Sequence, residues 1–339
     1  MTKKPITKGL AIVAVLISLP LLVVVFAYAG STQDSTWINV ISDECVYDNN
    51  NHAAFTSLEE WKGDMFVAFR EAGFHRATET DKGKIRVLQK TKSDWRPQHT
   101  FTIDGEDLRD PGFLQFKNKL FLYTNDYYSE YKKEGWTDLK QISHDAYYNP
   151  YIWKKRVYKN VAYGIGNAYG KWPMLLRSND GVNWKVICEY KLGGNASEAD
   201  MVFIADTMYV CFRLDTPAGS NSMWGKSVYP FSESQWSMMD ISVASPEMVV
   251  HSDNTILLAG REYDFHRKHG KDQINMSLFA VNKEGKVKQK YIVDGQGGDQ
   301  GYASFSKRKD GLYYMSYYAG IENTAVRMLT FRINDDMLN

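Results

Sequence analysis

Three arginines share a local setting that could give them a common task. Arg70, Arg213 and Arg261 each follow a short apolar run with the composition of a β-strand. A planar guanidinium can hold a carboxylate through two parallel hydrogen bonds, so arginines that converge on one place would bind an acidic group. Taken singly, each could instead be a solvated charge or the partner of an adjacent acid such as Glu71 or Glu262.

Further polar residues flank the same runs, and their types suit nucleophilic or acid–base chemistry. Those that open the segments before the runs are His52, Arg109, Asp110, Glu198, Glu247 and Tyr302, and those that follow the runs include Glu71, His75 and Tyr317. A tyrosine beside a carboxylate base can act as a nucleophile, and a carboxyl in apolar or like-charged surroundings can donate a proton. Asp299 follows Gly297-Gly298 and could bind a sugar hydroxyl or close a turn, and we favour the turn.

A repeat positions these residues. Strand-like runs at 65–69, 120–123, 208–212, 256–259 and 312–317 each follow a turn signal such as Lys62-Gly63-Asp64. The segments before them start near residues 52, 109, 153, 198, 247 and 302, at intervals of 57, 44, 45, 49 and 55 residues. A period of this length is typical of a radial repeat of sheets. We therefore predict an all-β fold, a six-bladed β-propeller over residues 37–335.

Propeller geometry predicts where the polar residues meet. The innermost strand of each blade runs along the central channel, so its first residues and the loops after the second strands crowd one mouth. Aromatic residues make up 14% of the chain. We expect the tyrosine-rich runs 127–131 and 147–151 in long loops over this mouth, where they could stack on sugar rings or stiffen the loops.

Several motifs in chain order resemble one family. Ser178-Asn179-Asp180-Gly181-Val182-Asn183-Trp184 fits the S-x-D-G-x-x-W form of an Asp-box, whose Asp binds loop amides while its Trp packs between sheets. Five further stretches follow in chain order: Val67-Ala68-Phe69-Arg70-Glu71-Ala72, Gly83-Lys84-Ile85-Arg86-Val87, Leu108-Arg109-Asp110-Pro111, Glu198 with Arg213, and Gly301-Tyr302-Ala303-Ser304. They resemble the sialidase superfamily, and more closely its bacterial sialidase-like or exo-α-sialidase proteins. The resemblance covers nearly the whole chain from about Asn51.

This resemblance implies that Tyr302 is the nucleophile and that Glu198 is its base. An unperturbed phenol has a pKa of about 10, so it needs a carboxylate to take its proton. For the acid that protonates the leaving oxygen we favour Asp110, which could equally form a salt bridge to Arg109 or cap a strand turn; Glu71 and His75 are alternates. The expected activity is that of an exported retaining glycosidase that removes a terminal acidic sugar, with sialic acid as the first candidate.

One departure from the family keeps other activities open. The family's first blade opens with an arginine of the F-R-I-P type, where this chain has Asn51-His52-Ala53-Ala54. The predicted substrate-binding residues are Arg70, Arg109, Arg213, Arg261, His52, Glu71, His75, Glu247 and Tyr317, and the predicted partner is a sialoglycoconjugate or a uronic-acid polysaccharide. The alternatives are a non-catalytic lectin or adhesin for acidic glycans, and a glycosidase or lyase that acts on another acidic polysaccharide.

Charge and the N-terminal segment indicate the setting. The net charge is +1, and without Lys3, Lys4 and Lys8 the chain has 38 basic and 40 acidic residues, which argues against nucleic acid as a partner. Residues 9–29 carry no charge and end in Ala27-Tyr28-Ala29, the small-x-small form of a signal-peptidase site. We expect residues 1–29 to be a signal peptide, or a signal anchor because the apolar run is long enough to span a bilayer. The protein is then periplasmic or secreted, or anchored through residues 9–29. The chain has three cysteines without C-x-x-C spacing, and we expect no cofactor and no metal.

Overall fold

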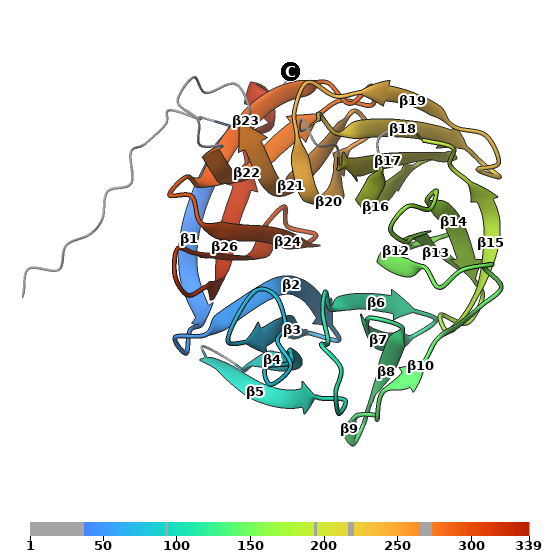
Figure 1. Cartoon of the computed structure of the whole chain (residues 1–339). Coiled ribbons are helices and arrows are strands. Elements are labelled where there is room, and N and C mark those ends of the chain that lie inside the picture. Colours follow the sequence, from blue (N-terminus) through green and yellow to red (C-terminus); the bar gives the residue numbers. More distant parts are fainter. Residues whose placement is uncertain (1–36, 92–93, 193–194, 216–219, 265–272, 339) are drawn as a thin grey trace, which may run out of the picture. The chain divides into compact units, whose positions relative to one another are not determined.

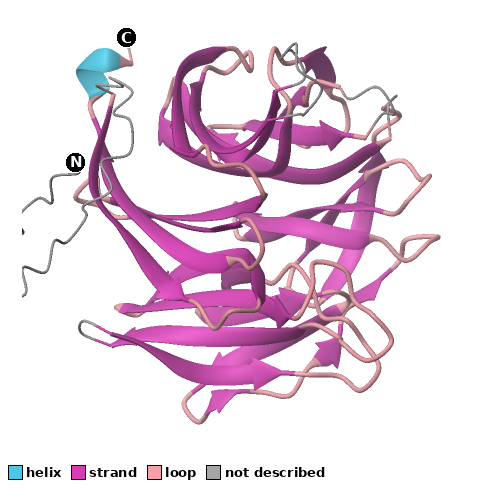
Figure 2. Cartoon of the chain, turned by 60° about the vertical axis from the view of Figure 1, so that its left-hand side comes forward, coloured by secondary structure: helices cyan, strands magenta, loops and turns pink. Residues whose placement is uncertain are grey.

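The computed structural model describes residues 37–338, apart from 92–93, 193–194, 216–219 and 265–272. The predicted signal peptide or anchor, residues 1–29, lies outside the described residues. The described chain consists almost entirely of strands and loops, with one short 3-10 helix, η1 (Asp335–Met337) (Figure 2). None of the helices in this part of the chain is long and apolar enough to cross a membrane.

The strands form six sheets arranged as blades around a central channel (Figure 1). From the channel outward, blade 1 consists of β2 (His52–Trp61), β3 (Asp64–Ala72), β4 (Lys84–Thr91) and β5 (Asp94–Phe101). Blade 2 consists of β6 (Gly112–Phe116), β7 (Lys119–Thr124), β8 (Tyr127–Lys132) and β10 (Lys140–Gln141), with β9 (Gly135–Trp136) paired to β8. Blade 3 consists of β12 (Tyr151–Tyr158), β13 (Val161–Asn167), β14 (Met174–Ser178), β15 (Asn183–Glu189) and the added strand β11 (Ser143–His144).

The other three blades have four strands each. Blade 4 consists of β16 (Ala196–Ile204), β17 (Thr207–Leu214), β18 (Met223–Val228) and β19 (Gln235–Met238). Blade 5 consists of β20 (Val243–Ser252), β21 (Thr255–Asp264), β22 (Gln273–Val281) and β23 (Val287–Asp294). Blade 6 consists of β24 (Asp299–Lys307), β25 (Tyr313–Gly320), β26 (Ala325–Ile333) and β1 (Ile38–Tyr47). The predicted all-β, six-bladed propeller is confirmed.

The second strands of the blades read as continuous apolar runs because neighbouring blades cover both of their faces. In β3 every residue after Asp64 is buried, and in β7 every residue after Lys119 is buried. The side chains between blades form one apolar layer after another around the ring, and this burial is the main source of the stability of the fold. Of the two tyrosine-rich runs that we expected in loops, 127–131 instead forms most of β8.

The innermost strands are irregular near the mouth. The register of pairing shifts within β2, β12, β16, β20 and β24. Phe55, Ser245 and Tyr302 have positive φ angles of 59°, 47° and 47°, and Asp110, two residues before β6, has a φ of 45°. A β-bulge turns a side chain out of the regular alternation, and bulges of this kind are common next to active sites. The bulges therefore direct side chains from several blades into the mouth.

The turn before β15 is held by its own acid. The Asp180 carboxylate accepts hydrogen bonds from the backbone N–H groups of Val182 (2.9 Å) and Asn183 (2.8 Å). Burial tends to raise the pKa of Asp180, but these donors lower it to about 2. Gly181 has a φ of +86°, which a residue with a side chain rarely adopts, and Trp184 is buried between blades 2 and 3. The turn thus fixes the end of the blade.

Candidate active site

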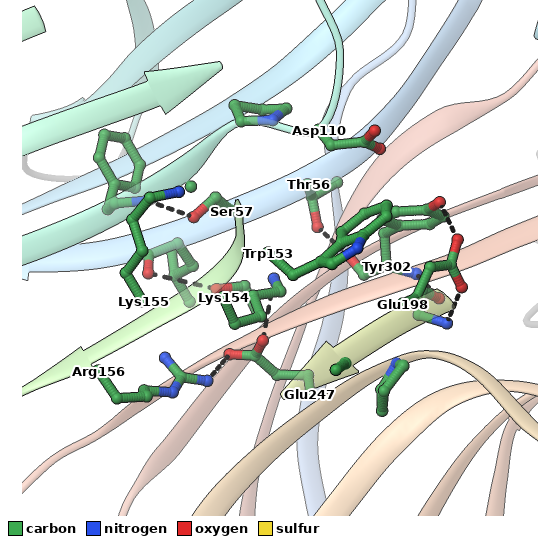
Figure 3. Close-up of a pocket in the computed structure, with 18 of the residues that line it drawn as sticks. Thr56, Ser57, Asp110, Trp153, Lys154, Lys155, Arg156, Glu198, Glu247 and Tyr302 are labelled. Carbon is green, nitrogen blue, oxygen red and sulfur yellow. Dashed lines mark hydrogen bonds and ion pairs between the residues drawn. The ribbon is translucent and has the colours of Figure 1, made fainter. Parts of the chain in front are cut away.

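A pocket lies between the innermost strands of the propeller, and every blade contributes to its lining. Its lining includes Thr56, Asp110, Trp153, Glu198, Glu247 and Tyr302, one residue from each blade or the loop that enters it (Figure 3). The space between the lining atoms, open solvent included, is about 740 Å³. A concave pocket of this kind, with a few polar groups directed inward, is the usual form of a small-molecule site.

Tyr302 and Glu198 meet in this pocket. The Tyr302 hydroxyl donates a hydrogen bond to Oε1 of Glu198, and Oε2 of Glu198 accepts hydrogen bonds from the Ser245 N–H (2.5 Å) and from Nη1 of Arg213 (3.1 Å). Burial tends to raise the pKa of Glu198, but Arg213 and the hydrogen bonds hold it below its usual value. Burial and the nearby Glu198 charge raise the Tyr302 pKa well above that of a free phenol. At neutral pH a neutral phenol therefore faces an ionised carboxylate that can take its proton.

Asp110 enters the pocket from the loop between blades 1 and 2. Its side chain is 13% exposed, and within the described residues its buried Oδ1 has no hydrogen-bond partner. Burial raises the pKa of Asp110 to about 6; the Arg109 charge opposes this rise and the Glu198 charge adds to it. The Arg109 guanidinium lies 4.0 Å away, at the limit of an ion pair. A carboxyl with this pKa can hold a proton and release it near neutral pH.

The four predicted arginines differ in how far they are already engaged. Arg109 and Arg213 are each 29% exposed, and within the described part of the chain Nη2 of neither one has a hydrogen-bond acceptor. Arg70 is fully buried and donates to Asp107 (2.7 and 2.9 Å) and to the Phe74 carbonyl (2.9 Å). The surroundings of Arg70 do not support the prediction that it binds substrate, because all three of its nitrogens already donate to protein acceptors.

Asp299 interacts with four hydrogen-bonding groups, although we had favoured a turn-closing role for it. Its Oδ2 is bonded to Nε2 of His52 (2.7 Å) and Nδ1 of His75 (2.5 Å), and its Oδ1 accepts from Arg261 (2.6 Å) and the Tyr318 hydroxyl (2.8 Å). Burial opposes ionisation, yet these partners hold the pKa of Asp299 far below its usual value. Arg261 also donates to the Gln300 carbonyl (2.5 Å), so it positions the cluster and is not free to take up an anion.

The same cluster has the atom types of a metal site. The ligand atoms of His52, His75 and Asp299 lie within 4.8 Å of one another. However, both imidazoles already bond to one carboxylate oxygen, and the Arg261 guanidinium holds the other. A divalent cation here would lie beside a fixed positive charge, which is unfavourable. We therefore regard this group as an ion-pair cluster.

Phe55 lies among these groups, and nothing in the sequence pointed to it. Its ring centroid is 4.6 Å from the Arg109 guanidinium, 4.7 Å from the Tyr302 ring and 5.2 Å from the His75 ring. Phe55 is fully buried and has a positive φ. It thus fixes the positions of Arg109, Tyr302 and His75, and the bulge in β2 is what turns it toward them.

Of the nine predicted substrate-binding residues only Glu247 lines the pocket, and two of the others, Glu71 and Tyr317, are bonded to side chains of other strands. Glu71 pairs with Arg86 (2.6 Å) and Lys84 (3.1 Å) on the face of β3 opposite to Arg70. The Tyr317 hydroxyl donates to Asp43 of the outermost strand at 2.9 Å. Successive side chains of a strand point to opposite faces. Glu71 therefore lies on the opposite face of β3 from Arg70, and Tyr317 lies on the opposite face of β25 from Tyr318. These contacts do not support a role for either residue in binding substrate; the neighbouring Tyr318 hydroxyl donates to Asp299.

Glu247 lies in the pocket but is held by blade 3. Lys154 (2.9 Å) and Arg156 (3.1 Å) form ion pairs with it, and Arg156 also pairs with Asp200 at 2.5 Å. These ion pairs neutralise the charge of Glu247 and connect blades 3 and 5 across the channel. The surroundings of Glu247 therefore do not support the prediction that it contacts substrate. The only signal for Lys154 and Arg156 in the sequence is a strand with charges on successive residues, Lys154-Lys155-Arg156.

Solved structures share this fold. No protein-family model and no curated protein matches the sequence. A Dyadobacter fermentans protein of unknown function aligns with a TM-score of 0.74 and 15% identity over 88% of this chain and 99% of that one. The α-L-arabinofuranosidase Arb93A of Fusarium graminearum, in complex with an iminosugar inhibitor, aligns with a TM-score of 0.62 and 12% identity over 86% of this chain and 98% of that one. Trypanosoma rangeli sialidase, in complex with 2,3-difluorosialic acid as a covalent intermediate, aligns with a TM-score of 0.61 and 11% identity over 87% of this chain and 59% of that one. The chain therefore has the fold of propeller glycosidases.

Proposed function

We propose that this protein is a retaining glycoside hydrolase that removes a terminal acidic sugar from a glycan, with sialic acid as the first candidate. Tyr302 is the nucleophile, Glu198 its base and Asp110 the acid. The observation that carries the proposal is the hydrogen bond from the Tyr302 hydroxyl to the ionised Glu198 carboxylate inside the channel pocket. The fold shared with glycosidases supports it, although a fold alone does not assign a reaction.

The reaction takes two steps. In the first, the Tyr302 oxygen attacks the anomeric carbon, its proton passes to Glu198, and Asp110 protonates the leaving oxygen as the glycosidic bond breaks. In the second, Asp110 takes a proton from water, the water oxygen replaces the tyrosine oxygen at the anomeric carbon, and Glu198 returns the proton to Tyr302. A neutral phenol suits a sugar whose anomeric carbon bears a carboxylate, because a carboxylate nucleophile would be repelled by that group.

The preference for an acidic sugar rests on Arg109 and Arg213. Both are 29% exposed, Arg109 lies 4.0 Å from Asp110, and Arg213 pairs with Glu198 at 3.1 Å. Within the described residues Nη2 of each has no hydrogen-bond acceptor, so both could donate to a substrate carboxylate. We also propose that residues 1–29 direct the protein out of the cytoplasm, as a signal peptide or an anchor, since glycans of this kind are found outside the cell.

The test is a panel of fluorogenic glycosides: an α-sialoside, a β-glucuronide, an α-galacturonide and an α-L-arabinofuranoside. Release of sialic acid, lost in Tyr302→Phe, is the expected result. Labelling with 2,3-difluorosialic acid followed by peptide mass spectrometry should place the adduct on Tyr302. Release that Tyr302→Phe leaves unchanged would contradict the nucleophile, and release of arabinose alone would contradict the acidic sugar. Binding without release would indicate a lectin or adhesin instead.

A further inference from the structure

Three aromatic side chains of blade 3 are exposed on the same side of the ring as the candidate active site. Tyr169 is 95% exposed, Tyr147 68% and Trp172 46%. Tyr169 and Trp172 lie in the loop between β13 and β14, and Tyr147 lies in the segment that leads into β12. Both segments are at the mouth, because β12 begins there and the paired β13 ends there. Large apolar side chains that gather at one exposed place indicate a binding surface.

Tyr148 joins these side chains into one unit. Its ring packs edge-on against the Tyr147 ring with centroids 4.9 Å apart, and its hydroxyl donates to the Trp172 carbonyl at 2.7 Å. The next residue, Asn149, is bonded to Asp126 (2.5 Å) and to His144 (2.9 Å). The segment is thus held in place by its own contacts, and a ligand would not have to order it, which lowers the entropic cost of binding.

Two more aromatic side chains of blade 3 line the channel pocket. Tyr151 and Trp153 have ring centroids 4.4 Å apart, and both line the pocket that contains Tyr302. The Tyr151 hydroxyl donates to the carbonyl of Asp110 at 2.9 Å, so this part of blade 3 contacts the proposed acid directly. A glycan chain whose terminal sugar lies against Tyr302 can therefore leave the channel along aromatic rings from Trp153 to the outer edge of blade 3.

We propose that Tyr147, Tyr169 and Trp172, the blade 3 aromatic surface, bind the internal sugars of the glycan chain whose end lies in the pocket. This inference rests on the proposed function and adds an oligosaccharide as the ligand. Sugar rings present C–H faces that pack on aromatic rings, while their polar groups need donors at the ring edge. Lys191, whose ammonium lies over one face of the Trp172 ring at 5.4 Å from its centroid, supplies a donor and a positive charge for an acidic chain and leaves the other face for a sugar.

The test compares oligosaccharides with single sugars in the full-length protein. Short oligomers of polysialic acid, galacturonan and α-1,5-arabinan are titrated by calorimetry, alongside the aryl glycosides of the same single sugars. In the double variant Tyr169→Ala/Trp172→Ala we expect the affinity for the oligomer to fall by about tenfold, while the affinity for the single-sugar glycoside stays within about twofold. The control is Tyr229→Ala, since Tyr229 is 50% exposed and is bonded to the Asp206 hairpin at the opposite end of the blades.

The possible outcomes separate the two proposals. An oligomer affinity that the double variant leaves unchanged, or that falls equally for the single sugar, would overturn the aromatic surface, as would wild-type protein that binds none of the three oligomers. A fall of the same size in Tyr229→Ala would do so too. If the oligomer binds with the expected dependence on these residues but is never cleaved, the hydrolase is wrong and the aromatic surface stands.

Discussion

Replacing Asp110 by asparagine should remove a pH-dependent loss of stability and also lower the activity. The burial that makes Asp110 a suitable acid also penalises its ionised form, and its Oδ1 has no hydrogen-bond partner within the described residues. Asparagine has nearly the same shape and tolerates the positive φ of 45° at this position better than most residues. The variant therefore removes the ionisable group and leaves the backbone as it is.

The magnitude follows from the shift in the pKa. Burial raises the pKa of Asp110 from 3.8 to about 6, and each pH unit corresponds to about 1.4 kcal/mol. The side chain is only 13% exposed, so little of this is screened by solvent. Because the folded pKa is raised, the contribution of Asp110 to stability is full below pH 3.8 and is lost as the pH rises through about 6. The Asp110→Asn variant has no such loss. The free energy of unfolding of the variant minus that of the wild type should therefore be up to ~3 kcal/mol larger at about pH 8 than at about pH 4.

The assay is urea unfolding of both proteins across this pH range, together with hydrolysis of a substrate with a poor leaving group. We expect kcat to fall by about 10²–10⁴. Any constant effect of the amide cancels when the difference in the free energy of unfolding is compared between the two pH values. A difference that does not change with pH would refute the claim that burial shifts Asp110, and with it the reason for choosing this residue as the acid.

Three further substitutions test the surrounding structure. Glu198→Gln should lower kcat by about 10²–10⁴, because an amide cannot accept the phenol proton, with unfolding measurements as the check on folding. Asp299→Asn should lower the free energy of unfolding by about 2 kcal/mol above pH ~4. Because the folded pKa of Asp299 is depressed, this difference from wild type should shrink as the pH falls below that point. A difference that stays constant with pH would contradict the charge cluster. Gly83→Ala should cost about 3 kcal/mol in urea unfolding, because its Cβ would lie 2.2 Å from Nε of Arg70, whereas Gly112→Ala, with nothing within 4 Å, should cost far less.

The blades could be predicted from the sequence because their signals are local. A second strand that is buried on both faces needs a continuous apolar run, and the hairpin before it needs a turn such as Lys62-Gly63-Asp64. Six such units, spaced by about fifty residues, leave few other architectures. The pairing of Tyr302 with Glu198 was reached through family motifs, and the structure brings these two side chains together.

Which way each polar side chain faces could not be predicted, because the bulges reset the alternation. Counting by two along β25 does not reveal whether Tyr317 or Tyr318 faces the mouth, since that depends on the register with β24, which shifts after Gly301. The role of Asp299 depends on partners from blades 1 and 5, which no spacing within the chain indicates. Phe55 looked like ordinary core, and its place between Arg109 and Tyr302 became apparent only in three dimensions.

The pairing of β1 with β26, from Ile38 opposite Ile333 to Tyr47 opposite Val326, has a consequence for when activity can appear. The first strand of the propeller completes a blade whose other three strands are the last three of the propeller in chain order. The proposed nucleophile lies on β24 of that blade, so Tyr302 reaches Glu198 only after both ends of the propeller have joined. A chain truncated or cleaved near either end of the propeller would keep most of its blades but would lack the Tyr302–Glu198 pair. The proposed hydrolysis would therefore be detected only in chains whose ring is closed.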